Sequence, residues 1–201
     1  MNKTIITIGR QYGSGGRQIG KQLAEQLGVP FYDRKLLTEA ANRSGIAESL
    51  FEANDEQPTN SLLYSLAVGS FSMDMPLNHK LFLAQFDAIK SIAQKGPCVI
   101  VGRCADYALR DRDDCVNVFI YASLQDRIKR VVEEYGVPEN KAGETILRTD
   151  KKRGSYYNYY TNKKWSHASS YNLSIDSGLV GIQGAVDLIA QCAKIVDNKK
   201  K

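Results

Sequence analysis

The sequence is poor in the residues that bind metals or cross-link secreted proteins. Its 201 residues include two histidines and four cysteines, and the cysteines form no C-x-x-C pair. This scarcity argues against a histidine-rich metal site and predicts reduced thiols in a cytoplasmic protein. The first residues lead into a β-branched run instead of the apolar core of a signal peptide. No apolar run approaches the roughly 20 residues of a membrane span, so we expect no membrane partner.

A strong excess of one charge sign is also missing. The net charge is +5, with 43% apolar and 24% charged residues, which is typical of soluble globular proteins. So small a positive excess does not predict a nucleic acid partner, but it suits a nucleotide or another phosphorylated small molecule. The length is sufficient for one domain with a sizeable core.

The most informative stretch is ITIGRQYGSGGRQIGKQLAEQLG, which begins at Ile6. It has the order strand, glycine-rich loop, amphipathic helix, and the loop holds Gly13, Ser14, Gly15 and Gly16. Glycines allow backbone N–H groups to turn inward around an anion, and the start of the following helix adds partial positive charge. The stretch therefore predicts a phosphate-binding loop, with a tight strand-to-helix turn as the alternative.

This loop lacks one component of the usual pattern G-x-x-x-x-G-K-[ST], in which the lysine binds phosphates and the hydroxyl binds Mg²⁺. Gly16 stands at the lysine position and Arg17 at the hydroxyl position. With a register shift of one residue, Arg17 becomes the cation and Gln18 replaces the hydroxyl residue. We predict that Arg17 takes over part of the lysine's role, although its planar fork differs from an ammonium group.

Strand and helix patterns alternate along the chain. Strands are predicted over residues 3–8, 29–32, 98–101, 116–122 and 172–176, and helices over 17–27, 35–42, 78–94 and 181–197, with another beginning after Ser123. This order predicts an α/β protein with a central parallel sheet and helices on both faces, which binds ligands beyond the carboxyl ends of the strands. Residues 44–78 are predicted to form a helical insertion, which could be a dimer surface, a second lid, or both.

Polar residues follow two of the predicted strands. Asp33 follows the second strand, where it could hold a hydroxyl, a base amine or a Mg²⁺-bound water, or else cap the next helix. Arg103 follows the third strand and could grip a phosphate, while Asp106 could reach a metal-bound water. The alternatives for these two are a surface arginine and a helix-capping aspartate.

Two later stretches are basic. Arg127 lies early in the helix after Ser123, where it could cover a nucleotide base or phosphate, or belong to an exposed basic face. The segment LRTDKKRGSYYNYY contains Arg148 and Arg153, whose charges would suit a mobile lid that closes over phosphates and excludes water. Its tyrosines at 156, 157 and 160 fit core or interface packing better than base stacking.

These motifs, in this order, resemble the cytidylate kinase-like branch of the nucleoside monophosphate kinases. The resemblance runs over nearly the whole chain, through ITIGRQYGSGGRQIGKQLAEQLGVPFYD, VIVGRCAD, VFIYASLQDRIKRV, DKKRGSYYNYYT and NLSIDSGLVGIQGAVDLI. It implies a P-loop kinase fold with a monophosphate-binding region and a lid. It also implies ATP with Mg²⁺ as phosphoryl donor and a pyrimidine nucleotide such as CMP as acceptor.

The resemblance assigns roles by position. It places the 13–16 loop at the donor phosphates, Arg127 near the donor nucleotide and Asp33 at the acceptor. Arg103 matches the arginine of a Gly-Arg-Asp motif whose aspartate is Cys104 here, and Arg148 and Arg153 lie near the lid arginines. The usual acceptor motif Thr-Gly-x-x-Tyr-Arg is replaced by residues 34–39, RKLLTE.

The sequence thus predicts one P-loop kinase domain over residues 1–201, with a lid-like segment at 139–165 and a homodimer left open. Phosphoryl transfer depends on alignment and charge neutralisation, which Arg17, Arg103 and the lid arginines would supply. Mg²⁺ would be held mainly by phosphate oxygens and waters, and Asp106 would contact those waters instead of the metal ion. One alternative is a catalytically silent nucleotide- or phosphate-binding module. Another, favoured by the missing acceptor motif, is a P-loop kinase for a non-nucleotide metabolite.

Overall fold

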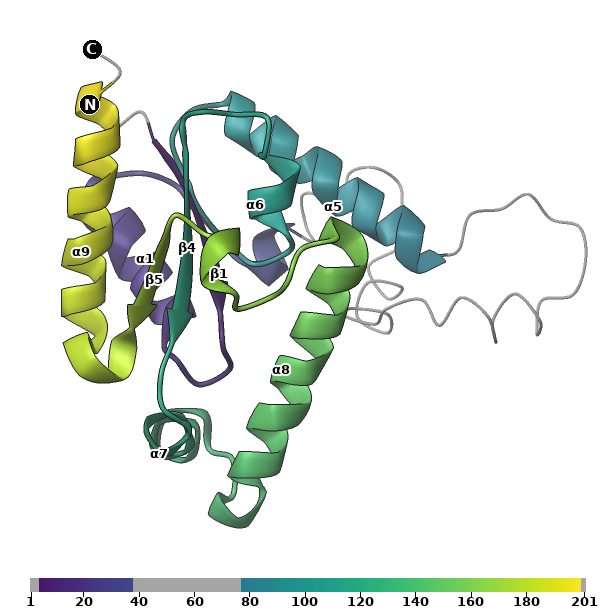
Figure 1. The fold of residues 1–201 in the computed structure, drawn as a ribbon, viewed down its shortest axis with the longest axis vertical. Coiled ribbons are helices and arrows are strands. Elements are labelled where there is room, and N and C mark those ends of the chain that lie inside the picture. The colour runs from purple at the N-terminus through teal and green to yellow at the C-terminus, as the bar shows by residue number, and fades with distance from the viewer. Residues whose placement is uncertain (1–3, 38–76, 200–201) are drawn as a thin grey trace, which may run out of the picture.

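A parallel sheet forms the centre of the computed structural model, which describes residues 4–37 and 77–199 (Figure 1). Its five strands are β1 (Ile5–Arg10), β2 (Phe31–Tyr32), β3 (Val99–Val101), β4 (Cys115–Tyr121) and β5 (Leu173–Asp176). They lie in the order β2-β3-β1-β4-β5, and every neighbouring pair is parallel. The predicted parallel sheet is confirmed, and β1 is its central strand. The predicted helix beyond residue 37 and the 44–76 part of the insertion lie outside the described residues.

The helices follow the predicted order. They are α1 (Gly16–Leu27), α5 (Leu77–Gln94), α6 (Ala105–Ala108), α7 (Leu124–Tyr135), α8 (Glu139–Thr161) and α9 (Ser177–Lys199). Local signals set several of their ends. Ser123 caps α7 by accepting a hydrogen bond from the Asp126 N–H at 3.1 Å, and Gly28 ends α1 with a φ of 66°. Gly181, with φ 71° and ψ 177°, separates the first turn of α9 from the longer helix.

The side chains of β1 alternate between two cores. Ile6 and Ile8 pack with α1 and α9 on one face of the sheet, whereas Ile5 packs with α5 and α6 on the other. Figure 1 shows these helix pairs on opposite sides of the strands. Because both faces are covered, β3 is apolar throughout and the buried parts of β1 and β4 are mostly apolar, as in buried parallel strands.

α9 is long and apolar enough to cross a membrane by length and composition, which is weak evidence because core helices pass the same test. In this chain, one side of α9 is buried in the core that covers the sheet, through Ala185, Val186, Ile189, Ala190 and Ala193. α9 is thus part of the core that holds β1 in place.

α8 is one continuous helix of 23 residues, and α7 packs against it. The C-terminal half of α8 joins an aromatic cluster in which Tyr160 stacks on Phe82 of α5 with 4.0 Å between ring centroids. Tyr156 and Tyr157 are buried in the same cluster. The tyrosines of the predicted lid therefore pack in the core, as their pattern favoured. The lid role of residues 139–165 stays a prediction.

Candidate functional site

The glycine-rich loop connects the central strand to α1, at the carboxyl edge of the sheet. Gly13 and Gly15 have φ values of 80° and 75°, a left-handed conformation that favours glycine. Gly15 is also the N-cap of α1 and has no side chain to offer, so no side chain caps the first N–H groups of the helix. Ser14 is buried, and its carbonyl oxygen accepts a hydrogen bond from the Ser177 hydroxyl at 2.7 Å. The loop therefore presents uncapped N–H groups from a backbone that α9 holds in position.

The loop glycines are also required by packing. A Cβ on Gly15 would overlap Ile182 of α9, and a Cβ on Gly13 would lie 2.8 Å from Val131 of α7. A side chain at Gly13 would press on Val131 and on the Arg127 backbone, whereas one at Gly15 would displace either the loop or the end of the Ile182 side chain.

We predict that Gly15→Ala weakens ATP binding because the new Cβ shifts the loop away from Ile182. Gly28→Ala is the matched control, because Gly28 has a similar φ of 66° but open space around it. Both variants should lose about 1–2 kcal/mol from the left-handed conformation, while only Gly15→Ala should lose ATP affinity. Thermal melting and calorimetric titration with ATP measure the two effects. Equal ATP affinity in the two folded variants would argue against a phosphate-binding role for the loop.

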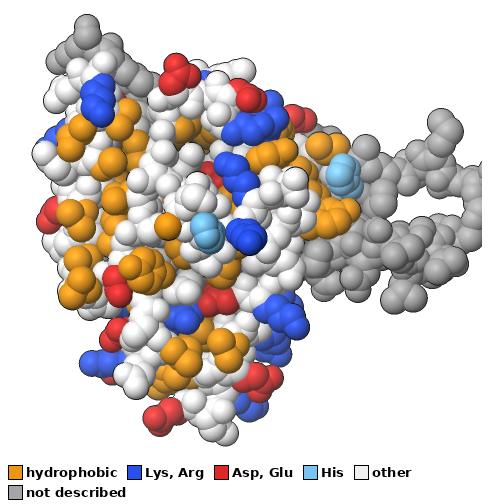
Figure 2. Space-filling view, in the orientation of Figure 1, with side chains coloured by type: hydrophobic (Ala, Val, Ile, Leu, Met, Phe, Trp, Pro, Cys, Tyr) orange, Lys and Arg blue, Asp and Glu red, His pale blue; other side chains and the backbone are white. Residues whose placement is uncertain are grey.

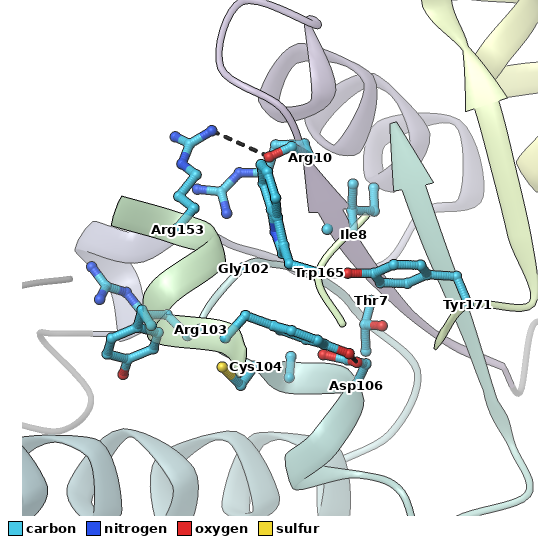
Figure 3. Close-up of a pocket in the computed structure, with 14 residues that line it drawn as sticks. Thr7, Ile8, Arg10, Gly102, Arg103, Cys104, Asp106, Arg153, Trp165 and Tyr171 are labelled. Atoms are coloured by element: carbon cyan, nitrogen blue, oxygen red, sulfur yellow. Dashed lines mark hydrogen bonds between the residues drawn. The ribbon is translucent and has the colours of Figure 1, made fainter. Parts of the chain in front are cut away.

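A pocket opens beside the loop (Figure 3). It is lined from the end of β1, the turn after β3, the C-terminal half of α8 and the segment leading to β5. The guanidinium groups of Arg10, Arg103 and Arg153 gather on one side of it (Figure 3). Arg153 donates a hydrogen bond to the carbonyl oxygen of Arg10 at 3.3 Å. Three arginines beside the uncapped start of α1 make this edge of the sheet suitable for an anionic ligand.

The turn after β3 brings Arg103 to this pocket. Gly102, Arg103 and Cys104 have φ values of 86°, 60° and 53°, and the Ala105 N–H bonds the Gly102 carbonyl at 3.2 Å. Left-handed conformations cost free energy in residues other than glycine, and such strain is concentrated at functional sites. The side chain of Arg103 is buried. Arg103 thus lies in the pocket wall at the carboxyl edge of the sheet, and the alternative of a surface arginine is wrong. Its contact with a phosphate stays a prediction.

Asp106 lies in the wall of the same pocket and is only 7% exposed. Its Oδ2 accepts a hydrogen bond from the Tyr157 hydroxyl at 2.6 Å. Burial raises the pKa of Asp106, although that hydrogen bond and the charge of Lys163 act in the opposite direction. Residues 4–37 and 77–199 contain no group of three or more histidine, cysteine, aspartate or glutamate side chains that could hold a metal ion.

The raised pKa of Asp106 predicts a pH-dependent stability. Below pH 3.8, the ordinary aspartate value, the carboxyl group is neutral in both the folded and the unfolded chain. As the pH rises, the unfolded chain ionises first, so the stability of the wild type relative to Asp106→Asn should fall by up to about 1.4 kcal/mol per pH unit, levelling off above the folded pKa. Melting temperatures of both proteins between pH 4 and 8 measure this difference. The exposed Asp111→Asn variant is the control, and a flat Asp106→Asn difference would contradict the prediction.

Arg17 and Asp33 form an ion pair with each other. The Arg17 Nε and Nη2 atoms lie 2.8 and 2.7 Å from Asp33 Oδ2. Asp33 also caps the next helical turn, since its Oδ1 accepts hydrogen bonds from the N–H groups of Lys35 and Leu36. Burial raises the pKa of Asp33, but the hydrogen bond from Arg17 and the Leu36 and Lys35 N–H groups outweigh it, and the net pKa is lowered. Arg17 thus points to Asp33, which directly follows β2. Its contact with phosphate stays a prediction.

Arg127 is buried beneath the loop, so the alternative of an exposed basic face is wrong for this residue. Its Nη1 lies 2.5 Å from Oδ2 of Asp150 on α8 and donates to the Tyr12 carbonyl at 3.4 Å. The other carboxylate oxygen of Asp150 accepts the Tyr12 N–H at 2.7 Å. Nearby, Arg130 donates to the Gly13 carbonyl at 2.8 Å. These arginines support the outer side of the loop.

Two other predicted residues lie apart from the pocket. Arg148 is exposed on α8 and Gln18 is exposed on α1, and neither lines the pocket. Sequence reasoning also missed Arg10 and Asp150. The sequence holds a signal for each of them. Arg10 stands where the phosphate-loop pattern has its first glycine, and Asp150 is the one acidic residue in the basic stretch LRTDKKRGSYYNYY.

Comparisons with known proteins show the family to which the chain is similar. Residues 5–179 match the model of the cytidylate kinase-like family. The chain is 26% identical to a cytidylate kinase of Desulfurococcus amylolyticus over 179 residues, which is 88% of this chain and 85% of that protein. A cytidylate kinase of Ignicoccus hospitalis is 24% identical over 92% of this chain and 96% of its own length.

Solved structures give the same result for the fold. The crystal structure of an uncharacterized protein from Eubacterium ventriosum has a TM-score of 0.75 and 30% identity, covering 95% of this chain and 98% of that one. Shikimate kinase from Bacteroides thetaiotaomicron has a TM-score of 0.55 and 14% identity over the same shares of the two chains, so its likeness concerns the fold alone. The fold is that of the P-loop kinases, and the chain belongs to the cytidylate kinase-like family.

Proposed function

We propose that this protein transfers the γ-phosphoryl group of ATP to a nucleoside monophosphate, with a CMP-like nucleotide as acceptor. One observation carries the proposal: the uncapped start of α1 lies beside a pocket into which Arg10, Arg103 and Arg153 bring their positive charges. Phosphoryl transfer needs such a pair of neighbouring anion sites, because both substrates carry phosphates and the transferring group must be aligned between them.

The residues present fit a nucleoside triphosphate. The N–H groups from Gly13 to Arg17 would hold the donor phosphates, and the pocket beyond Gly102 would hold the acceptor. Mg²⁺, bound mainly to phosphate oxygens and water, supplies charge neutralisation when present. Within the pocket, Arg103 and Arg153 would orient the acceptor phosphate, and the aromatic wall of Tyr156, Tyr157, Trp165 and Tyr171 would limit the access of water.

A silent binding module is the second candidate, because Gly16 replaces the lysine of the pattern and Arg17 pairs with Asp33. A module that only binds needs the loop and the pocket, but no additional charge on the transferring group.

A substrate panel separates these functions. Wild-type protein is incubated with ATP and Mg²⁺ and with each nucleoside monophosphate or small hydroxyl-containing metabolite, and ADP formation and the phosphorylated product are quantified. We expect the pyrimidine monophosphates to be phosphorylated fastest. ATP binding without any product would favour the silent module, and turnover restricted to a sugar or another hydroxyl metabolite would indicate a non-nucleotide kinase.

A further inference from the structure

We propose that Arg10 takes the place of the phosphate-loop lysine, as the cation that joins the donor phosphates to the acceptor pocket. The inference rests on the proposed function and names a residue within it. It begins with the pattern G-x-x-x-x-G-K-[ST], which in this chain aligns its first glycine with Arg10 and its lysine with Gly16. Compared with the usual pattern, this chain has a cation where the first glycine stands and a glycine where the lysine stands, at the two ends of the same loop.

The structure shows that this exchange preserves the occupied space. A Cβ built on Gly16 would lie 2.6 Å from the Cβ and 3.0 Å from the Cγ of Arg10. The stem of Arg10 therefore occupies the volume that a side chain at position 16 would enter. A lysine side chain at position 16 and an arginine side chain at position 10 would occupy the same space. A cation at one of these positions therefore requires glycine at the other.

The far end of Arg10 reaches the acceptor side. Its guanidinium lies against Gly102, where a Cβ would overlap Nη1 and lie 3.0 Å from Cζ. Gly102 precedes Arg103, and the Arg10 side chain is part of the pocket wall (Figure 3). Arg10 therefore extends from the start of α1 at Gly16 to the turn at Gly102. This is the path along which a phosphoryl group would pass between two bound phosphates.

The other arginines around the loop lie in different places. Arg17 is paired with Asp33, and its side chain is 67% exposed. Arg130 donates to the Gly13 carbonyl and lies 3.6 Å from Glu134, on the outer side of the loop. Neither enters the space above Gly16 that Arg10 fills.

The test combines binding with turnover. Binding of ATP and of inorganic tripolyphosphate is measured by calorimetry for the wild type, Arg10→Met and Arg17→Ala, and turnover is measured with the best acceptor.

Arg10→Met keeps an apolar stem over Gly16 and removes the charge. It should bind both polyphosphates about 10- to 100-fold more weakly, since hydrogen bonds to charged groups are worth 1.5–3 kcal/mol. Turnover should fall by at least about 100-fold. Lys21→Ala removes an exposed cation one turn along α1 and should change neither measurement.

A double variant tests the exchange directly. Arg10→Gly combined with Gly16→Lys restores the first glycine and the lysine of the usual pattern, while Arg17 still occupies the hydroxyl position. It should recover polyphosphate binding lost in Arg10→Gly. Gly16→Lys alone should not gain affinity, because its side chain meets the Arg10 stem. Thermal melting confirms that each variant is folded.

The outcomes separate this inference from the proposed function. Wild-type affinity in folded Arg10→Met overturns the role of Arg10, and a loss confined to Arg17→Ala gives that role to Arg17. A wild type that binds polyphosphate but phosphorylates no acceptor overturns the proposed function alone, because the binding series still decides on Arg10. A wild type that binds neither ATP nor tripolyphosphate overturns both.

Discussion

Replacing Asp150 by alanine should lower the free energy of unfolding by about 3–5 kcal/mol, the range seen when one partner of a buried ion pair is removed. The Asp150 and Arg127 side chains are only 13% and 8% exposed, and 2.5 Å separates their charged atoms. Without Asp150, the Arg127 guanidinium stays buried with its main counter-charge missing. The Tyr12 N–H also loses its acceptor. The effect should therefore reach both the fold and the phosphate loop.

Urea denaturation of the wild type and Asp150→Ala measures this loss. Asp150→Leu combined with Arg127→Met removes both charges and keeps apolar volume, so it should recover much of the stability. Glu134→Ala is the control for a pair near the surface, since Glu134 is 48% exposed and lies 3.6 Å from Arg130. Its loss should stay within about 1 kcal/mol. A similarly small loss for Asp150→Ala would show that the buried pair adds little to the fold.

Most of the fold could be predicted because its signals are local. The run before Gly9 is β-branched on consecutive residues, which is typical of a strand that fits a buried sheet. Ser123 with Asp126, and Gly28 after Leu27, marked helix ends through hydrogen bonds or backbone angles that involve only a few neighbouring residues. Alternation of such strands and helices then left a parallel sheet as the natural arrangement.

The partners of the charged side chains could not be predicted in the same way. Arg17 and Asp33 were each identified as site residues, but their pairing depends on how α1 and the end of β2 lie side by side. Asp150 and Tyr12 are 138 residues apart and meet only because α8 packs beneath the loop. A long side chain can reach several partners, and tertiary packing selects one of them. For this reason the sequence predicted where the loop lies, but it did not predict that Arg17 pairs with Asp33.

The backbone conformation of the turn after β3 could not be predicted from the sequence either. A strand followed by Gly-Arg predicted an arginine at the ligand edge, and Arg103 is there. The sequence carried no sign that Arg103 and Cys104 both adopt left-handed backbone. That conformation is imposed by the short connection from β3 to α6, and it holds the Arg103 side chain in the pocket.

The largest loss of activity is expected from Arg103. Arg103→Met should reduce phosphoryl transfer by about 10²- to 10³-fold, the cost of deleting one preoriented charge from a transition-state site. Arg103 is 8% exposed and extends from the same turn that Arg10 touches, so its charge would act close to the transferring group. Methionine keeps an apolar stem in the buried site, which limits the loss of packing. Turnover with the best acceptor is measured beside the melting temperature.

Arg103→Lys is the matched variant. It keeps the charge and, like Arg103→Met, places an unbranched side chain on the same left-handed backbone. Lysine lacks the planar fork that binds two phosphate oxygens at once, so turnover should recover only in part. If both variants are folded and work at the wild-type rate, Arg103 does not contact the transferring phosphate. If Arg103→Met loses activity in proportion to its loss of folded protein, the residue supports the turn and the charge at the acceptor must come from Arg153.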